Sequence, residues 1–227
     1  MTMILSGGGG VTKNPAAYRL FADSVDKTRP VLYIPLASVP ENYAENYAKF
    51  ALTMANLGVT STRLCHSPEY FRDFDPASIG GIYCAGGNTF RLLKILRECG
   101  AIDKIRDYVR GGGAYLGSSA GAIIAGGDIM PIIYMDANAV LLDDTRGMDM
   151  MGGYSTIAHY NNSTSEFKNT EWREAAHKLA TKYDRLIALS EESAVVITSE
   201  RTYIQGADTV VFDNGVARIV RDGENLY

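Results

Sequence analysis

The pentapeptide G-S-S-A-G at residues 117–121 is the part of this sequence whose residue types and spacing most directly suggest chemistry. It follows a short apolar run at residues 114–116 and opens a run of small residues. A G-x-S-x-G motif between a strand and a helix is typical of a nucleophile elbow, a turn so sharp that the central serine projects its hydroxyl above the sheet. The next amide, that of Ala120, can then face a developing oxyanion. The motif therefore predicts Ser119 as a nucleophile and Ala120 as an oxyanion donor.

The pentapeptide alone also fits a glycine-rich turn at the end of a buried strand. A serine nucleophile further needs a base to remove its proton and an acid to orient that base, and both must come from elsewhere in the sequence. The sequence has three histidines. His177 falls on the polar face of a predicted helix over residues 170–183, and His66 stands in a connecting loop. His159 ends a short apolar run and precedes polar residues, which is typical of a side chain at the rim of a cleft. We therefore predict His159 as the base and keep His66 in reserve.

The orienting acid is less well determined by the residues. An apolar run stops at Glu191 and Glu192 before a second apolar run begins, and a carboxylate between two buried strands needs a partner. Asp128, Asp143 and Asp144 are alternatives, each of which also fits a solvated loop. We expect one of the two glutamates to accept a hydrogen bond from the His159 ring.

A second oxyanion donor is expected from a neighbouring strand end with free amides. The segment at residues 85–89, A-G-G-N-T, fits this role because glycines permit close approach of a substrate. Asn88 or Thr89 is expected to cap the helix that follows. A simple turn before a helix would have the same residues. This segment can serve both as a helix cap and as an oxyanion donor.

The elements that must position these residues alternate along the chain. Apolar runs predict strands at residues 3–6, 31–36, 59–65, 80–85 and immediately before Ser119, and helical spacing predicts helices at residues 15–25, 42–57, 89–99 and 102–109. This alternation argues for an α/β fold with a mostly parallel sheet and helices on both faces. Ligands of such sheets bind at the carboxyl ends of the strands.

The C-terminal part of the chain has a different pattern. Short apolar runs at residues 194–198, 202–205, 209–212 and 216–220 are separated by turn residues. Asp213-Asn214-Gly215 between the last two runs is a strong hairpin signal. We expect this tail to extend the sheet with antiparallel strands, and the whole chain, residues 1–227, to form a single domain.

The glycine run at residues 7–10 matches neither a Walker motif nor G-x-G-x-x-G. It predicts a turn over the edge of the sheet that borders the site rather than a nucleotide-binding loop. We expect no cofactor and no metal ion.

Composition places further limits on function. Apolar residues make up 46% and charged residues 21% of the 227 residues, and the formal net charge is −4. No basic stripe indicates nucleic-acid binding, and no apolar run approaches the ~20 residues of a membrane span. The first residues lack the basic region of a signal peptide. Cys65, Cys84 and Cys99 lack C-x-x-C spacing, which favours reduced thiols in a cytoplasmic protein.

Four blocks of this sequence together resemble the dipeptidase E and cyanophycinase group of serine peptidases. They are residues 86–93, 117–122, 158–160 and 189–191, and their order and spacing match. The resemblance implies a three-layer α/β fold akin to class I glutamine amidotransferases, with serine where those enzymes use cysteine. It also implies a triad and an oxyanion hole, here Ser119 as nucleophile, His159 as base, Glu191 as acid, and the amides of Gly87 and Ala120 as donors.

The resemblance also implies a small peptide as substrate. The best-known members of the family cleave after aspartyl residues, and a basic side chain upstream of the glutamate recognises the aspartate in dipeptidase E. Here Thr170 falls at that position, and Arg173 or Lys168 would have to substitute, although both also fit a helix surface. Besides Arg173, we expect Asn88 and Thr89 to bind substrate.

Two other functions stay open at the level of sequence. An α/β-hydrolase esterase would use the order serine, acid, histidine, which Ser119, Asp143 or Asp144, and His159 can supply. A non-catalytic relative would use the pocket to bind a peptide. The segment around residues 148–154, rich in methionine, can form a pocket wall, internal packing or an interface, and a homodimer is one arrangement compatible with it.

Overall fold

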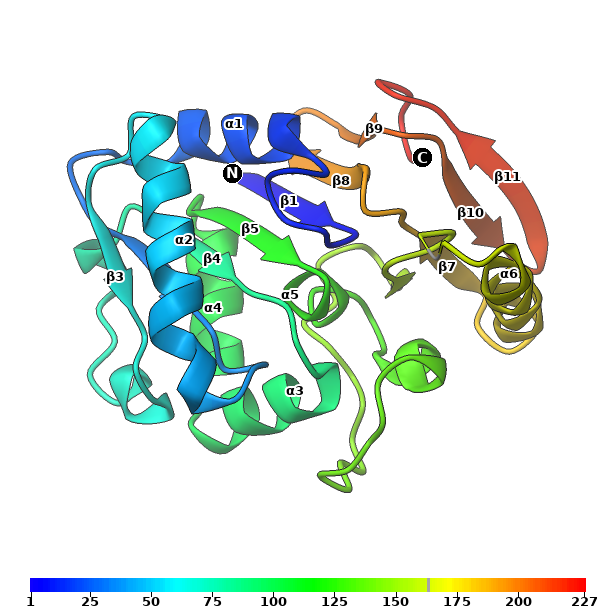
Figure 1. The fold of residues 1–227 in the computed structure, drawn as a ribbon, viewed down its shortest axis with the longest axis horizontal. Helices are drawn as coiled ribbons and strands as arrows, with labels where there is room; N and C mark the ends of the chain where they lie inside the picture. Colours follow the sequence, from blue (N-terminus) through cyan, green and yellow to red (C-terminus); the bar gives the residue numbers. More distant parts are fainter. Residues whose placement is uncertain (163) are drawn as a thin grey trace.

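A seven-stranded sheet forms the centre of the molecule, in the order β3-β2-β4-β5-β1-β8-β9 (Figure 1). The computed structural model describes residues 1–162 and 164–227. The strands of this sheet are β1 (Thr2–Ser6), β2 (Val31–Ile34), β3 (Thr62–Leu64), β4 (Gly81–Cys84), β5 (Ala114–Ser118), β8 (Ser193–Thr198) and β9 (Thr202–Gly206). Strands β1 to β5 pair in parallel, and β8 and β9 add to the sheet antiparallel. The predicted, mostly parallel sheet is confirmed.

Helices cover both faces of this sheet, as the alternating pattern predicts. One face packs against α1 (Pro15–Ser24) and α2 (Tyr43–Asn56), and the other against α3 (Thr89–Glu98), α4 (Ala101–Arg110) and α5 (Ala120–Ile123). Short 3-10 helices lie in the connections, namely η1 (Pro40–Asn42), η2 (Pro68–Phe71), η3 (Pro76–Ser78) and η4 (Met130–Tyr134).

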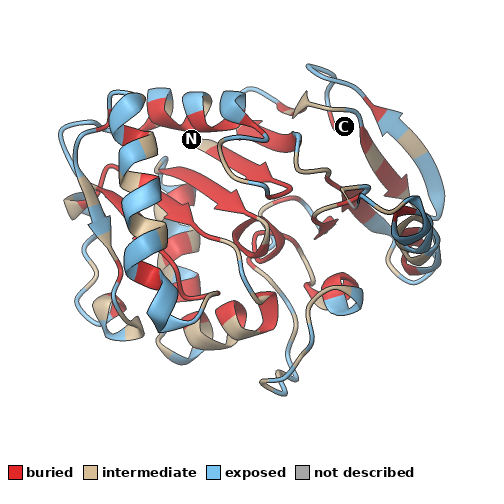
Figure 2. Cartoon of the chain, viewed as in Figure 1, coloured by how far each residue is buried: buried red, intermediate tan, exposed pale blue. Residues whose placement is uncertain are grey.

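The two faces arise from the alternation of side chains along each strand. Ile4 of β1 lies in the hydrophobic cluster with α1 and α2, whereas its neighbours Met3 and Leu5 lie in the cluster with α3 to α5. All five residues of β5 are buried. Figure 2 shows the same burial along the central strands. The strand that leads into Ser119 is therefore held on both faces.

A second, four-stranded sheet has the order β11-β10-β7-β6 and lies beside α6 (Glu166–Ala180) in Figure 1. Its strands are β6 (Ser155–Ile157), β7 (Arg185–Ala188), β10 (Thr209–Asp213) and β11 (Val216–Val220). The hairpin predicted at residues 213–215 joins β10 and β11. The tail extends the main sheet only through β8 and β9, because β10 pairs with β7 instead.

The methionine segment before β6 belongs to the core. Met148, Met151 and Tyr154 are buried, and the hydrophobic cluster that contains them includes residues of both sheets. The internal packing that the sequence allowed for these residues is confirmed. Within residues 1–162 and 164–227, no helix has the length and apolar character needed to cross a membrane.

Candidate active site

Ser119 lies in a sharp turn between β5 and α5, as the sequence predicts. Its φ of 51° lies in the left-handed region, which non-glycine residues rarely adopt and which is enriched at functional sites. The flanking glycines leave no space for a side chain. A Cβ atom on Gly121 would lie 2.1 Å from the carbonyl oxygen of Cys84, and one on Gly117 would lie 2.4 Å from that of Gly121. The motif therefore needs glycine on both sides of the serine.

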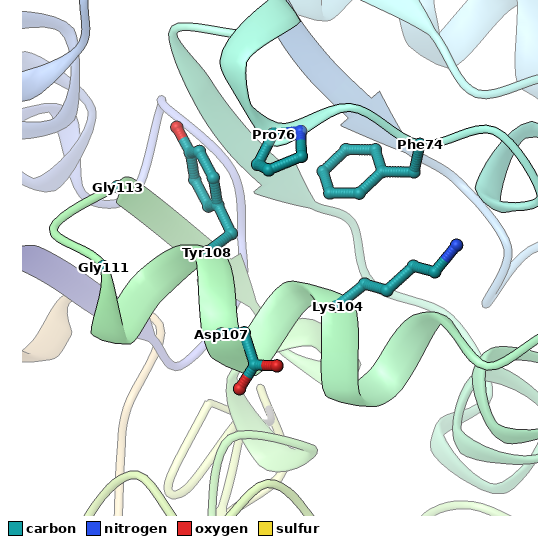
Figure 3. A pocket seen from close by; sticks show the side chains of 7 residues that line it. All are labelled: Phe74, Pro76, Lys104, Asp107, Tyr108, Gly111 and Gly113. Carbon is teal, nitrogen blue, oxygen red and sulfur yellow. The ribbon is translucent and has the colours of Figure 1, made fainter.

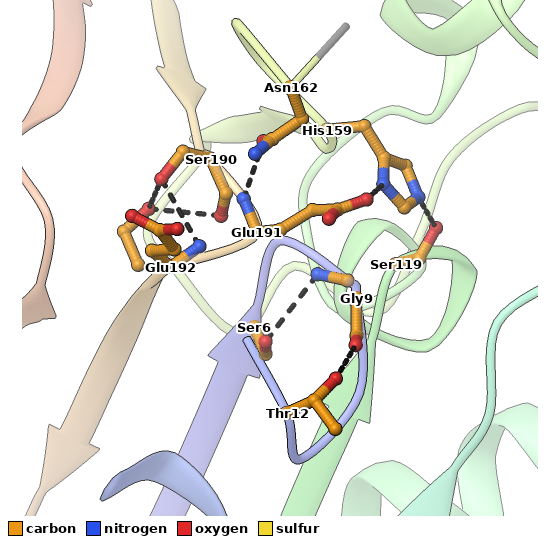
Figure 4. A network of polar contacts seen from close by, with 11 residues as sticks. Ser6, Gly9, Thr12, Ser119, His159, Asn162, Ser190, Glu191 and Glu192 are labelled. Atoms are coloured by element: carbon orange, nitrogen blue, oxygen red, sulfur yellow. Dashed lines mark hydrogen bonds and ion pairs between the residues drawn. The ribbon is translucent and has the colours of Figure 1, made fainter. Parts of the chain in front are cut away.

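A continuous hydrogen-bonded chain joins Ser119, His159 and Glu191 (Figure 4). The Ser119 Oγ lies 2.9 Å from the His159 Nε2, and the His159 Nδ1 lies 2.8 Å from the Glu191 Oε1. A carboxylate accepts hydrogen bonds and donates none, so Nδ1 donates to Glu191. In the neutral ring, Nε2 is then left to accept from the serine hydroxyl. These are the three residues that the sequence analysis selected as nucleophile, base and acid.

The parallel pairing of β6 and β7 brings the histidine and the glutamate together. His159 follows β6 by two residues, and Glu191 follows β7 by three. Beyond the strands, the amide of Leu189 donates to the carbonyl of Ile157 at 2.8 Å, and that of Tyr160 donates to Leu189 at 2.9 Å. Because both strands run in the same direction, their carboxyl ends present the two side chains at one place.

The end of β1 connects this pair to the serine. The amide of Ser119 donates to the carbonyl of Ser6, and the amide of His159 donates to the carbonyl of Gly7, each at 3.0 Å. The amide of Gly7 donates in turn to Ser193 at 3.1 Å, just beyond Glu191. One turn of backbone therefore fixes the segments that carry all three residues.

The same turn packs directly on the side chains of the base and the acid. A Cβ atom on Gly8, which has a φ of +120°, would lie 2.3 Å from the His159 Cε1. A Cβ atom on Gly9 would lie 2.8 Å from the Glu191 Oε2. The prediction that the glycine run borders the site is confirmed, and at Gly8 a side chain would collide with the imidazole.

Ala120 and Gly87, the two residues predicted to donate to an oxyanion, both lie at the amino-terminal side of a helix. Ala120 is the first residue of α5, where an amide has no acceptor within the helix, and Gly87 lies in the turn between β4 and α3. In the described part of the chain, neither amide donates a hydrogen bond to a protein acceptor. The neighbouring amide of Asn88 donates to Ala37 at 3.0 Å, which holds the turn in place.

Asn88 and Thr89, which the sequence analysis assigned to substrate binding, have protein partners. The Asn88 Oδ1 accepts from the amide of Arg91 at 2.9 Å, as a helix cap does, and its Nδ2 donates to the carbonyl of Ala137 at 2.9 Å. Thr89 is fully buried, and its hydroxyl donates to the Asp136 Oδ2 at 2.6 Å. The Thr89 side chain is buried and its hydroxyl proton is used within the protein, so the structure gives no support to that expectation.

Asp136 is the residue of this region that sequence reasoning missed. Its Oδ2 accepts from both the amide of Thr89, at 2.7 Å, and the Thr89 hydroxyl. The carboxylate therefore anchors the segment after η4 to the start of α3, beside the proposed oxyanion turn. No local motif marks this aspartate, because its partner is 47 residues away in the sequence.

Arg173 lies on α6 and contacts the turn that follows the histidine. Its guanidinium donates to the Asn161 Oδ1 at 3.1 Å and also binds Glu166. Burial raises the pKa of Tyr160, and the positive charge of Arg173 partly opposes that rise. The cation therefore lies near residues 160–161, whereas Lys168 is exposed on the same helix.

The other candidates for base and acid lie elsewhere. His66 and His177 are exposed. Asp144 lies 2.7 Å from Arg146 and 3.2 Å from Arg97, and hydrogen bonds from Arg146 hold its pKa well below the usual range. The Nδ1 of His159 is hydrogen-bonded to Glu191. The serine–acid–histidine order of an esterase is therefore not assembled from Asp143 or Asp144.

Asp128 and Glu192, two further candidates for the acid, lie outside the hydrogen-bonded chain of Ser119, His159 and Glu191. Asp128 accepts from the amide of Met130 at 2.8 Å and has a local structural role, and Glu192 is exposed. Among the residues that the structure describes, no group of three or more His, Cys, Asp or Glu side chains has the arrangement of a metal site.

A hollow of about 510 Å³ on the molecule is remote from these residues (Figure 3). It is lined by Phe74, Pro76, Lys104, Asp107, Tyr108, Gly111 and Gly113. Gly113 directly precedes β5, whereas Ser119 follows the other end of the same strand. The length of a strand therefore separates this hollow from the serine.

Comparisons with known proteins agree with the fold and with the predicted resemblance. Residues 3–204 match the model of peptidase family S51. A Peptidase E from Salmonella newport is 31% identical over 83% of this chain and 78% of its own length, and one from Escherichia coli O6:K15:H31 is 29% identical over 88% and 86%.

Two solved structures have the same fold. A protein from Listeria monocytogenes EGD-e has a TM-score of 0.69 at 24% identity, over 90% of this chain and 98% of its own. A peptidase from an acI-B1 Actinobacterium has a TM-score of 0.76 at 19% identity, over 99% of this chain and 96% of its own. At these identities the two structures bear on the fold alone.

Proposed function

The chain belongs to peptidase family S51, and from this premise we propose that it hydrolyses dipeptides through an acyl-enzyme on Ser119. One observation carries the proposal, namely the hydrogen-bonded chain from the Ser119 Oγ through the His159 ring to the Glu191 carboxylate. A serine hydroxyl becomes a useful nucleophile when a neighbouring base accepts its proton and a third group orients that base.

The first half of the reaction acylates the enzyme. The Ser119 Oγ attacks the peptide carbonyl carbon while the His159 Nε2 takes the hydroxyl proton, and Glu191 stabilises the imidazolium that forms. The amides of Gly87 and Ala120 donate to the carbonyl oxygen as it becomes an oxyanion. The carbon–nitrogen bond then breaks, and the imidazolium returns its proton to the leaving amine.

The second half releases the acyl group. A water molecule gives a proton to the His159 Nε2 as its oxygen attacks the ester carbonyl, and the same two amides stabilise the second oxyanion. The bond between the acyl carbon and the Ser119 Oγ breaks, and the imidazolium reprotonates the serine. The histidine thus acts as base and acid in each half, and no proton is gained or lost by the enzyme.

Arg173 is our candidate for the group that selects the acyl residue. A guanidinium can pair with a carboxylate through two parallel hydrogen bonds, and this one contacts Asn161, two residues after the histidine. The side chain of Arg173 is 36% exposed, so a ligand can reach it. An aspartyl residue before the scissile bond fits this chemistry, which gives aspartyl dipeptides as the substrate class.

A panel of dipeptides tests the proposal. We expect Asp-X peptides to be cleaved faster than uncharged Xaa-X peptides, and blocked dipeptides to be cleaved poorly. Arg173→Ala should lower kcat/KM for Asp-X about ten-fold to a hundred-fold through loss of the charged hydrogen bonds, whereas Lys168→Ala, a matched change on the same helix, should not. Equal or absent turnover of Asp-X would remove the aspartyl assignment, and no turnover of any peptide would remove the dipeptidase proposal.

A further inference from the structure

A second hollow, of about 440 Å³, opens beside the serine on the face of the sheet covered by α1 and α2. Gly86 forms part of its wall, and a Cβ atom at this glycine would lie only 3.7 Å from the Ser119 Oγ. Gly10 forms another part, in the turn that packs on the histidine. This volume is within the range of sites for small ligands. The hollow therefore begins where a bound peptide would be cleaved.

Aromatic rings form the inner wall of this hollow. Phe50 and Tyr83 stack with centroids 4.5 Å apart, and Tyr33 stacks on Tyr83 at 5.4 Å. The hydroxyls of Tyr18 and Tyr83 lie 2.8 Å apart. Burial raises the pKa of both Tyr33 and Tyr83, so these phenols remain neutral at physiological pH. Neutral rings that are already packed against one another favour an apolar or aromatic side chain as ligand.

The charge at the hollow excludes one class of side chain. Among the described residues that line it, the only charged one is Lys49 of α2. Its ammonium group lies 2.6 Å from Glu45, and both side chains are largely exposed, so the pair is a surface ion pair. A lysine or arginine side chain in the hollow would find no carboxylate to pair with among these described lining residues.

The position of the hollow indicates which residue of the substrate would occupy it. Figure 1 shows α2 and α6 on opposite sides of the carboxyl end of β5. If Arg173 on α6 binds the acyl residue, an extended dipeptide that passes over Ser119 places its second residue on the side of α2. This step rests on the proposed function.

We propose that the hollow between α2 and the turn after β1 is the binding site for the leaving residue of the dipeptide, and that it selects apolar and aromatic side chains over small or basic ones. Apolar contact with the exposed ring edges and exclusion of water supply the affinity, and the lining residues that the structure describes offer a cationic side chain no carboxylate. The site binds the amino-acid product until it dissociates.

Thr53 of α2 gives a test that does not disturb the core. It lines the hollow and is half-buried, so Thr53→Trp fills the space from the helix surface. Leu52→Trp is the matched control. Leu52 precedes Thr53 on the same helix, is 65% exposed and does not line the hollow. In the wild type, kcat/KM for Asp-Phe should exceed that for Asp-Gly by about ten-fold or more, and Asp-Lys should be the poorest. Thr53→Trp should remove most of this preference, and Leu52→Trp should keep it.

Binding to a Ser119→Ala background separates this inference from the proposed function. Calorimetry should find that Asp-Phe binds more tightly than Asp-Gly, and that adding Thr53→Trp weakens Asp-Phe binding about ten-fold or more. Unchanged preference for phenylalanine in Thr53→Trp, or no preference in the parent, would overturn the inference. If Thr53→Trp instead changes the preference for the first residue, measured as binding of Phe-Gly against Asp-Gly, the inference would also be overturned. Binding as expected without any hydrolysis by the wild type would instead contradict the proposed function.

Discussion

The two sheets of this protein contribute different parts of the site and hold them in different ways. The seven-stranded sheet supplies Ser119 and the two candidate oxyanion amides from strands whose residues are almost all buried. The four-stranded sheet supplies His159 and Glu191 from short strands, and its outer strand β11 is largely exposed. The nucleophile is thus fixed by the backbone of a buried sheet, and the base and acid are fixed at the junction between the sheets.

This difference shows where the geometry is most sensitive. The serine conformation is set locally by close contacts of Gly117 and Gly121. The position of the histidine depends on a junction in which Gly7 accepts its amide hydrogen bond and Gly8 contacts its ring. Asn162 adds a further link, since its Oδ1 accepts from the amide of Glu191 at 2.6 Å. Changes at the junction should therefore impair catalysis with little effect on the main sheet.

Removing Ser119, the nucleophile that the seven-stranded sheet supplies, should have the largest effect on kcat. Ser119→Ala deletes the nucleophile and should lower kcat by about 10⁵-fold to 10⁶-fold. Steady-state hydrolysis of the best dipeptide measures this, with thermal unfolding as the control for folding. Residual activity within about ten-fold of the wild type would show that another group attacks the substrate.

Removing the charge supplied by the second sheet should have the next largest effect. Glu191→Gln keeps the shape of the side chain but no longer stabilises the imidazolium, and should lower kcat about 10⁴-fold. Glu192→Gln is the matched control, since this neighbouring glutamate is exposed and its substitution should leave kcat unchanged. A similar loss in both variants, or a loss only in Glu192→Gln, would contradict the assignment of the acid.

The junction itself can be tested with a single methyl group. Gly8→Ala should displace the His159 ring and lower kcat/KM about 100-fold. Gly112→Ala is the control, because Gly112 has a φ of +102° but no atom within 4 Å of its added Cβ. Both variants should lose some stability from backbone strain, and only Gly8→Ala should lose activity. If activity falls equally in both, backbone strain rather than contact with the histidine is the cause.

The smallest effect is expected from thiol modification in the main sheet. Burial raises the pKa of Cys65 and of Cys84 to about 12. At pH 8 only about one of each thiol in ten thousand is the reactive thiolate, so a thiol reagent should modify neither in the native protein and should leave activity unchanged. Cys99 is less buried and should react first. Mass spectrometry of the modified protein measures this, and rapid modification of Cys84 at pH 8 would contradict the burial of β4.

The two sheets also differ in how well the sequence predicts them. Strands such as Val31–Ile34 and Gly81–Cys84 are continuous apolar runs between helices, so local patterns are sufficient for the main sheet. The strand Ser155–Ile157 has only three residues, and it pairs with Arg185–Ala188 across a helix. A pattern of that length cannot specify its partner, which is why the second sheet was not predicted.

The same distinction applies to the site. Ser119 is predicted from a local motif and His159 from a comparison of the three histidines, whereas Glu191 is preferred to Glu192 through the family resemblance. The contact of Asp136 with Thr89 and the packing of Gly8 on the imidazole join segments far apart in the sequence. Such contacts depend on tertiary structure and leave no periodic signal in the chain.

The most direct test of the account is the reaction of the protein with a fluorophosphonate, followed by mapping of the labelled peptide by mass spectrometry. A serine polarised by the His159 ring, itself oriented by Glu191, should be labelled at Ser119 in the wild type and much more slowly in Glu191→Gln. Labelling at another residue, or an equal rate in Glu191→Gln, would contradict it.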